Sequence, residues 1–577
     1  MLPLFLVLSI LAFLDRSSCA ATSAAPRWRP DLRTRGLGTN VNNGLHARSA
    51  LESVATTTSI VDNSTIVPVA LSSDKMTYYA LSGIGNLSFR LALDTASADL
   101  WAVSSACTSS TCKLPTYPLW FQSTTFVPVN ANTSQFTVSY ADNTGASGFI
   151  ARESVTVGNL TVPSQAIGLA TTSNVTFKDE VSGVLGLGFP RLSAIYNTVV
   201  NATPFFASLS QNGSLDYPVF GLSLTRDTGG SLSFGAIDGS VVTNRSLIEF
   251  NEVVPFAPFS GSGGNSTSYL QWALVLEAIS INGTAIAPEP TYPVQTMNKS
   301  IALIDVGTAG IFGPYQDVAR IFSQIDSARL VDDTTGQYVI PCDTEETMAF
   351  NFGGMDFILQ PTDYLIGPAS GNPNLCLSWP RALPPSSDGI DWQIGSAFLR
   401  TVYSIYSFGI NTKEPPMIGF YPLSNATAIS QTPDEVVSFL SSASATVSTT
   451  LPNFLLSTPT YSTPSYTFNA SLAASATPGK IATTGLATST YSPLLNVHDR
   501  NATAIQTLSP SPTVLTLILT DASGHTVTTT STASQRSITL GLPSELSNGA
   551  LSVSARRHGG GAGAVLLGVV LAWALFL

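Results

Sequence analysis

Histidine is nearly absent from this sequence. Its 577 residues include four histidines, and none of them lies between residues 47 and 497. Catalytic systems that pair a serine or cysteine with histidine are therefore not expected there, because they need an imidazole to take up the nucleophile's proton. A histidine-ligated zinc site is excluded from the same stretch on the same ground. Catalysis within residues 47–497 would have to use other side chains.

Charged residues are also scarce, at 11% of the chain. Acidic residues outnumber basic ones by 36 to 25, which gives a net charge of −11. Phosphate binding needs clustered Lys and Arg, so nucleic acid is not expected as a partner. An acidic chain gains little positive charge as the pH falls, and this suits an acidic compartment.

Cysteine occurs only five times, and Cys19 lies in the N-terminal targeting segment. The four others are an even number, which in a secreted chain suggests disulfides. The spacing of Cys107 and Cys112 also fits one half of a metal site. No second half with suitable spacing is present in the sequence, so disulfides are the preferred interpretation.

A pattern of strand, turn and strand occurs twice in the sequence. Apolar residues lead into Asp94, small residues follow it, and a second apolar run closes at Trp101. The same design surrounds Asp305. Each copy predicts a strand, a tight turn that carries a carboxylate, and another strand. An apolar-apolar-glycine segment follows each copy at a similar spacing, ending at Gly186 and at Gly395.

This duplication predicts two similar lobes that each bring one aspartate to a shared cleft. Two carboxylates that lie close together cannot both ionise, so one keeps a proton while the other acts as a base. Such a pair suits the activation of water. The alternative for either aspartate alone is a residue that caps a turn, but the duplicated context argues against it.

Over roughly residues 66–423 the chain resembles the pepsin family of aspartic proteases. Asp94-Thr-Ala-Ser97 and Asp305-Val-Gly-Thr308 stand where that family carries Asp-Thr-Gly followed by Ser or Thr. The resemblance implies an all-β, bilobal fold with few short helices and an active-site cleft between two duplicated lobes. It also implies an aspartic-type endopeptidase, a hydrolase in which Asp94 and Asp305 hold one water, with no cofactor and no metal.

The same resemblance gives roles to other residues. Ser97 and Thr308 would donate hydrogen bonds to the two carboxylates. Tyr140, on the hairpin at 136–148, would belong to a flap that closes over substrate and would bond toward Trp101. A packed tyrosine on an ordinary hairpin is the alternative for that residue. The family's disulfide pattern implies one bridge in each lobe, joining Cys107 to Cys112 and Cys342 to Cys376.

Four positions depart from the family's pattern. Ala96 replaces a glycine in the first turn, and a Cβ is tolerated there only if φ is negative. Val306 replaces a threonine whose hydroxyl, in the family, bonds to the opposite turn. Ser396 stands where many relatives carry an aspartate, and Ala141 replaces a glycine of the flap. Because both carboxylates remain, weakened or retuned catalysis is expected rather than none.

The N-terminal part predicts targeting and maturation. Residues 1–20 carry a short apolar run followed by small residues, which indicates a secretory signal; a membrane anchor is the alternative. Residues 21–65 are arginine-rich, and the resemblance suggests a propeptide whose cations face the cleft carboxylates. A plain disordered leader is the alternative. The catalytic lobes are expected at 66–240 and 241–423, with a helix at about 314–328.

The C-terminal part predicts a stalk and a lipid anchor. Residues 424–547 are rich in Ser, Thr, Ala and Pro, which is typical of an O-glycosylated stalk that buries no core. A hairpin within residues 512–528 would interrupt it. Residues 548–577 combine small residues, a spacer and an apolar tail, the pattern of a GPI signal with attachment at Asn548. A transmembrane helix is the alternative.

The sequence thus predicts a GPI-anchored aspartic endopeptidase of the yapsin type, secreted as a zymogen to the cell surface or wall. Peptides or proteins would be its substrates, the outer membrane leaflet would hold its lipid, and it would be a monomer. The alternatives are a catalytically silent relative that binds peptides, and an adhesive mannoprotein. Acceptor sites for N-glycosylation fit secretion; they include Asn86, Asn132, Asn159, Asn201, Asn265, Asn282 and Asn425.

Overall fold

The computed structural model describes residues 63–119, 123–199, 201–227, 229–255, 269–370, 372–411, 413–424, 430–442, 467–468, 486, 490–495, 505–509, 514–520, 526–532 and 540. The expected signal at 1–20, almost all of the expected propeptide, and Asn548 with the GPI signal lie outside the described residues. Asn265 and Asn425 also lie outside them.

Short strands separated by turns make up most of the body, because its apolar runs are brief, rich in Val, Ile and aromatic residues, and bounded by Gly, Asn, Asp and Ser. Strands of the first half are β1 Thr65–Leu71, β2 Tyr78–Ile84, β3 Leu87–Asp94, β4 Leu100–Val103, β5 Val127–Pro128, β6 Gln135–Ser139, β7 Gly145–Val157, β8 Leu160–Ser173, β9 Val181–Gly186, β10 Val219–Thr225, β11 Gly229–Phe234 and β12 Ile237–Asp238.

The second half repeats this texture. Its strands are β13 Glu249–Glu252, β14 Ala273–Leu276, β15 Ala278–Ile281, β16 Thr284–Ile286, β17 Ser300–Ile304, β18 Ile311–Gly313, β19 Arg329–Asp332, β20 Gln337–Pro341, β21 Met348–Phe352, β22 Met355–Leu359, β23 Leu365–Ala369, β24 Asn372–Ser378, β25 Arg381–Ala382, β26 Trp392–Ile394, β27 Val402–Ser407 and β28 Met417–Pro422. Beyond them lie β29 Thr507–Leu508, β30 Val514–Thr520 and β31 Thr526–Thr532.

Helices are few and short, as the all-β prediction requires. The α-helices are α1 Ala194–Thr198, α2 Phe205–Gln211, α3 Tyr315–Phe322, α4 Pro361–Tyr364, α5 Ser396–Leu399 and α6 Pro433–Ser442; the 3₁₀ turns are η1 Ser110–Cys112, η2 Val129–Asn132, η3 Pro190–Leu192 and η4 Arg245–Leu247. The helix expected at 314–328 is α3, which begins after Pro314 and ends early, at Phe322. Ile325 is nonetheless buried beyond its end.

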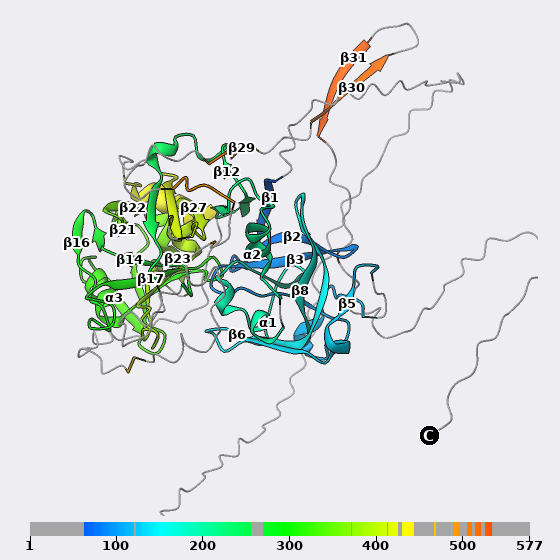
Figure 1. Ribbon diagram of the computed structural model, residues 1–577. Coiled ribbons are helices and arrows are strands. Elements are labelled where there is room, and N and C mark those ends of the chain that lie inside the picture. The colour runs from blue at the N-terminus through cyan, green and yellow to red at the C-terminus, as the bar shows by residue number, and fades with distance from the viewer. Residues whose placement is uncertain are drawn as a thin grey trace, which may run out of the picture. The chain divides into compact units, whose positions relative to one another are not determined.

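A central sheet joins the two halves of the body (Figure 1). In it β10, from the first half, pairs antiparallel with β27, from the second half, and β28 continues the sheet to β13. The first half adds its remaining strands on the other side, through β11, β1, β2, β3, β9 and β4. The fold is therefore all-β and bilobal, with a shared sheet between the lobes.

Each lobe contains the same three-strand motif, and the motif carries the aspartate. In the first lobe β9 lies between β3, which runs parallel to it, and β4, which runs antiparallel. In the second lobe β26 lies between β17, which runs parallel to it, and β18, which runs antiparallel. Asp94 pairs with Gly186 in this register. The apolar-apolar-glycine segments of the sequence are thus the middle strands of the duplicated motif.

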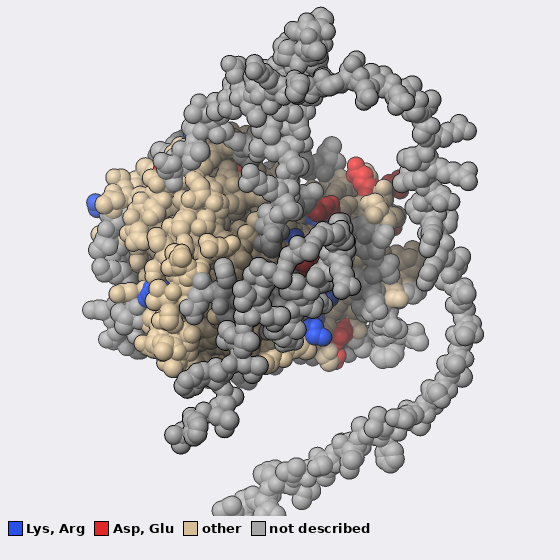
Figure 2. Space-filling view, turned by 90° about the vertical axis from the view of Figure 1, so that its right-hand side faces the viewer, with Lys and Arg blue, Asp and Glu red and all other residues tan. Residues whose placement is uncertain are grey.

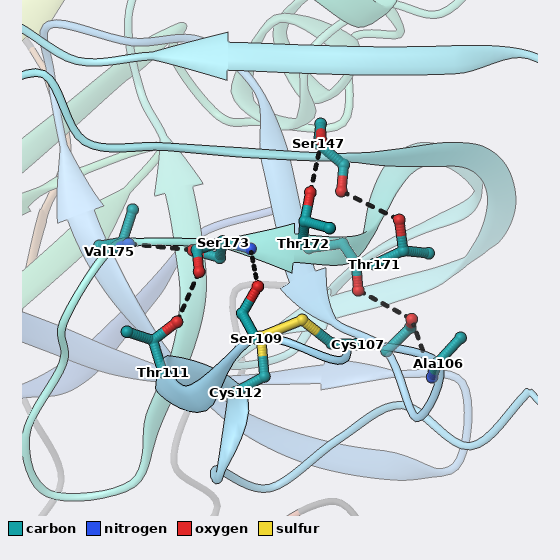
Figure 3. The surroundings of a disulfide bond; sticks show 12 residues. Ala106, Cys107, Ser109, Thr111, Cys112, Ser147, Thr171, Thr172, Ser173 and Val175 are labelled. Atoms are coloured by element: carbon teal, nitrogen blue, oxygen red, sulfur yellow. Dashed lines mark hydrogen bonds between the residues drawn. A yellow bond between two sulfur atoms is a disulfide. The ribbon is translucent and has the colours of Figure 1, made fainter.

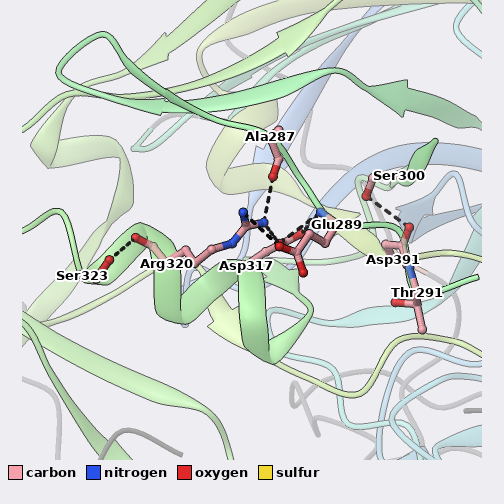
Figure 4. A network of polar contacts seen from close by, with 8 residues as sticks. All are labelled: Ala287, Glu289, Thr291, Ser300, Asp317, Arg320, Ser323 and Asp391. Atoms are coloured by element: carbon pink, nitrogen blue, oxygen red, sulfur yellow. Dashed lines mark hydrogen bonds and ion pairs between the residues drawn. The ribbon is translucent and has the colours of Figure 1, made fainter. Parts of the chain in front are cut away.

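Two buried aspartates of the second lobe form hydrogen bonds with neighbouring segments (Figure 4). Asp391, next to β26, accepts hydrogen bonds from the Ser300 hydroxyl and the Ile301 N–H of β17 at 3.1 Å each. On α3, Asp317 accepts from the Glu289 N–H at 3.2 Å and also bonds to Arg320. These buried carboxylates satisfy backbone N–H groups that would otherwise lack partners.

Both disulfides implied by the resemblance are present, joining Cys107 to Cys112 and Cys342 to Cys376. Figure 3 shows the first one beside the end of β8. There Ser109 accepts the Ser173 N–H at 3.1 Å, and Thr111 donates to the Ser173 carbonyl at 2.5 Å. The small disulfide loop is therefore fixed to a long strand of the first lobe.

Parts of the range expected to be stalk belong to the folded body. Helix α6 packs against α4 and buries Val436 and Leu440. Farther along, Leu495 and Ile505 are buried, and β29 pairs with β12 of the first half. The expectation that residues 424–547 bury no core is wrong for these segments. The expected hairpin is present as the two-stranded sheet of β30 and β31.

Candidate active site

Asp94 and Asp305 meet where the two duplicated motifs face each other. Asp94 ends β3 and Asp305 follows β17 directly, so each carboxylate sits in the turn of its own motif. Both are buried, with 8% and 5% of their surface exposed. A Cβ on Gly307 would lie 2.8 Å from Asp94 Oδ1 and 3.2 Å from Asp305 Oδ1. One small group could therefore touch both carboxylates, and glycine leaves that space open.

The hydrogen bonds on the two sides correspond. Asp94 accepts the Ala96 N–H at 2.9 Å and the Ser97 hydroxyl at 2.5 Å. Asp305 accepts the Gly307 N–H at 2.8 Å and the Thr308 hydroxyl at 2.7 Å. In each turn the carboxylate is oriented by two donors: a backbone N–H two residues after the aspartate and a side-chain hydroxyl three residues after it. The structure places Ser97 and Thr308 at the positions expected from the sequence.

Burial and the facing carboxylate both act on Asp94. Burial disfavours its charged form, and the nearby charge of Asp305 adds to the effect, so the pKa of Asp94 rises to about 7. The hydrogen bonds from Ser97 and Ala96 oppose this rise. The site can therefore hold a proton at pH values where an ordinary aspartate has lost it.

Thr95 ties one lobe to the other. Its hydroxyl donates to the Ile304 carbonyl at 3.1 Å and accepts the Val306 N–H at 3.0 Å. The same hydroxyl lies 3.3 Å from Asp305 Oδ1. Val306 occupies the equivalent position of the second turn and is buried, and its side chain has no polar atom that could bond back to the first turn. The tie is therefore one-sided, and Asp305 has one more nearby hydroxyl than Asp94.

The other departures from the family pattern cause no backbone strain. Ala96 and Ala141 are not among the residues with positive φ, so neither turn requires glycine at these positions. Ala96 packs against an apolar cluster that includes Leu270 and Ile301 of the second half. Ser396 begins α5 and donates its hydroxyl to the Ala309 carbonyl at 3.0 Å, so it helps to hold the second turn.

The hairpin of β6 and β7 carries Tyr140 at its tip. The Trp101 indole N–H donates to the Tyr140 hydroxyl at 2.8 Å, and both rings belong to one apolar cluster. Burial, followed by the Asp94 charge, raises the pKa of Tyr140, so the phenol stays protonated. Trp101, on β4, is fully buried, so the tyrosine is held by a rigid partner on the strand that follows Asp94.

Two supporting residues were missed by the sequence reasoning. Thr95 was not singled out, although it directly follows the aspartate in the repeated motif. Asp99, five residues after Asp94, accepts the Ala194 N–H at 2.8 Å and the Ser193 hydroxyl at the start of α1. Its partners lie far along the chain, so no local sequence signal identifies its role.

On the face shown in Figure 2 most of the visible described residues are uncharged. Within the ranges that the structure describes, no group of His, Cys, Asp and Glu has the composition of a metal site. No helix in those ranges is both long and apolar enough to cross a bilayer.

Comparisons with known proteins agree with this geometry. The family model described as eukaryotic aspartyl protease matches residues 77–414. The chain is 30% identical to an aspartic protease of Phaffia rhodozyma over 56% of this chain and 72% of that protein. It is 28% identical to major aspartyl peptidase 1 of Cryptococcus neoformans, over 59% and 67%. It is also 28% identical to cathepsin E of Aquarana catesbeiana, over 62% and 83%.

The hydrogen bonds of the Thr95 hydroxyl predict that its removal lowers the stability of the protein. Thr95→Val should lower the free energy of unfolding by about 1–3 kcal/mol, because the buried Val306 N–H and Ile304 carbonyl lose their partner. Urea unfolding measures this effect. Thr137→Val makes the same chemical change at an exposed position of β6 and should be nearly neutral. Equal effects of the two substitutions would contradict the role given to Thr95.

Proposed function

The chain belongs to the eukaryotic aspartyl protease family and is therefore an aspartic-type endopeptidase, and from that premise we propose that it acts at the cell surface through Asp94 and Asp305. The observation that carries the proposal is the pair of buried carboxylates that share the space above Gly307. Peptides or proteins are its substrates. The pair activates one water, without a covalent intermediate.

The hydrogen-bond donors around the two carboxylates indicate which aspartate acts as acid and which acts as base. Asp305 accepts the Gly307 N–H and the Thr308 hydroxyl, and the Thr95 hydroxyl shares its one proton between Asp305 and the Ile304 carbonyl. Asp94 accepts the Ala96 N–H and the Ser97 hydroxyl. Donors favour the ionised form of a carboxylate. We therefore assign the proton of the free enzyme to Asp94 and the role of base to Asp305.

The reaction then follows from these two states. Ionised Asp305 takes a proton from the water as the water oxygen attacks the peptide carbonyl. Protonated Asp94 donates its proton to the carbonyl oxygen, so that charge does not accumulate on it. The intermediate then collapses: Asp305 gives its proton to the leaving amine, the C–N bond breaks, and Asp94 takes a proton from a hydroxyl of the intermediate, which restores both starting states. Tyr140, held by Trp101, covers the site and excludes bulk water.

The surrounding segments support secretion and anchoring. We propose a signal at 1–20, a propeptide at 21–65 and a GPI anchor at Asn548, which together give a yapsin-like enzyme of the plasma membrane or wall. The acceptor residues Asn86, Asn159, Asn201 and Asn282 are exposed, as glycan attachment requires. In this proposal the enzyme is a monomer and uses no cofactor.

Catalysis by the pair predicts that Asp94→Asn and Asp305→Asn each lower kcat/KM by about 10²–10⁴-fold or more. Cleavage of an unfolded protein at pH 5 measures this loss. Asp326→Asn, at an exposed position, is the matched control and should keep full activity. Full activity in either site variant would refute the mechanism. A wild-type protein that binds a transition-state peptide inhibitor but cleaves nothing would instead favour the silent alternative.

The raised pKa of Asp94 predicts the alkaline limb of the pH profile. Activity needs the shared proton, so kcat/KM should fall about tenfold per pH unit above about 7. Stability should fall as well. The unfolded chain releases this proton near pH 3.8 and the folded chain near 7, so the folded state loses its advantage as the pH rises across that interval. Constant activity from pH 5 to 9 would contradict the shared proton.

Lipid anchoring predicts that phosphatidylinositol-specific phospholipase C releases the protein from intact cells. The phospholipase cleaves the phosphatidylinositol of a GPI anchor and so frees the attached protein, whereas a transmembrane helix would keep the protein in the membrane. Immunoblotting of the supernatant before and after treatment measures the release. A known GPI-anchored protein of the same cells serves as the positive control. If the treatment releases that protein but not this one, the proposed GPI anchor is wrong.

A further inference from the structure

A buried glutamate outside the active site binds the C-terminal part of the chain. Glu414 is fully buried, and its Oε2 accepts the backbone N–H groups of Leu494 and Leu495 at 2.9 Å each. Tyr217 donates its hydroxyl to the same oxygen at 2.7 Å. Hydrogen bonds to a charged group are among the stronger ones in proteins. A side chain near the end of the catalytic body is therefore satisfied by residues about 80 positions farther along.

Neighbouring contacts extend this attachment. The Tyr491 hydroxyl donates to the Leu215 carbonyl at 2.8 Å and accepts the Leu215 N–H at 3.3 Å, and its ring meets the edge of Tyr217. The Leu486 N–H donates to the Gly409 carbonyl at 3.2 Å, and the Leu486 side chain is buried. These bonds use backbone groups of the body, so they need no special side chain there.

A second set of contacts lies farther along the chain. The Ile505 carbonyl accepts from Arg245 at 2.9 Å, and the next carbonyl, of Gln506, accepts the Ile237 N–H at 2.9 Å. Thr507 and Leu508 then form β29, which pairs parallel with β12. The extension thus supplies a missing edge partner to a strand of the body, in the manner of a bound peptide.

Apolar packing accompanies these hydrogen bonds. Ile505 has no exposed surface, and Leu495 is 6% exposed. Both lie in a cluster with side chains of the lobe junction, which include Tyr217, Val219, Ile237, Val242, Tyr403 and Ile410. Burial of two such apolar side chains favours the association, because it removes apolar surface from water. This cluster is complete only when the extension is in place.

We propose that Leu486, residues 490–495 and residues 505–508 form a C-terminal strap, by which the catalytic body keeps the C-terminal part of the chain even when the chain is cut between residues 443 and 485. No cysteine follows Cys376, so no disulfide would link the two fragments. The strap would thus retain a nicked enzyme on whatever its C-terminus is attached to. This consequence rests in part on the proposed function: if the proposed anchor at Asn548 is correct, a chain cut between residues 443 and 485 would keep its catalytic body on the lipid.

The test uses the full chain with a recognition sequence for a heterologous protease inserted after Ala476. The folded protein is cut, and its fragments are separated by gel filtration at micromolar concentration. We expect both fragments to elute together and to separate in denaturant. Immediate separation of the wild-type fragments would overturn the proposal. The outcome does not depend on peptidase activity, so failure of the strap and failure of the proposed function are distinguishable.

Variants identify the contacts that matter. Ile505→Asp and Glu414→Gln should each speed release of the C-terminal fragment about tenfold or more, because each leaves buried groups without suitable partners. Val437→Asp and Glu345→Gln make the same changes at exposed positions and should leave release unchanged. Tyr491→Phe is a milder variant in case Glu414→Gln does not fold. Equal release rates in strap and control variants would contradict this binding mode.

Discussion

The rest of the structure depends on two buried carboxylates that lie too close together to be ionised at the same time. Asp94 and Asp305 face each other across the lobe junction, and among the residues that the structure describes no lysine or arginine forms an ion pair with either one. Without such a cation, the pair lowers its energy by keeping a proton. The lobes must hold this arrangement rigidly. The parallel and antiparallel neighbours of β9 and β26 supply that rigidity, because each aspartate lies in a turn between two strands of a sheet.

The lobe junction is asymmetric where the carboxylates need it. Thr95 bonds across the junction, whereas Val306, at the equivalent position, contributes only packing. The Thr95 bond brings a hydroxyl near Asp305, and Val306 brings none to Asp94. Val306, the departure from the family pattern that suggests weakened catalysis, thus also makes the surroundings of the two carboxylates differ. In our proposal this difference assigns the role of acid to Asp94 and the role of base to Asp305. Trp272 of the second lobe adds another tie, since its indole donates to the Leu187 carbonyl at 3.0 Å.

Much of this arrangement could be predicted from the sequence, because its signals are local or repeated. The turns at Asp94 and Asp305, the bilobal β fold and the hairpin of Tyr140 all follow from short patterns. Partners distant in the chain left no such signal. The role of Thr95 depends on a turn more than 200 residues away, and Asp99 bonds to Ser193 and Ala194. The strap was not predicted because Leu495 and Ile505 are isolated apolar residues in a Ser- and Thr-rich stretch. Their burial becomes evident only from their contacts with the catalytic body.

The location of the shared proton is the central claim, and neutron diffraction from deuterated crystals near pH 5 tests it most directly. The account predicts one deuteron on the carboxylate pair, bonded to an Asp94 oxygen, and one water held between Asp94 and Asp305. A pair without a deuteron, or two carboxylates that each bind separate waters with no shared one, would contradict it.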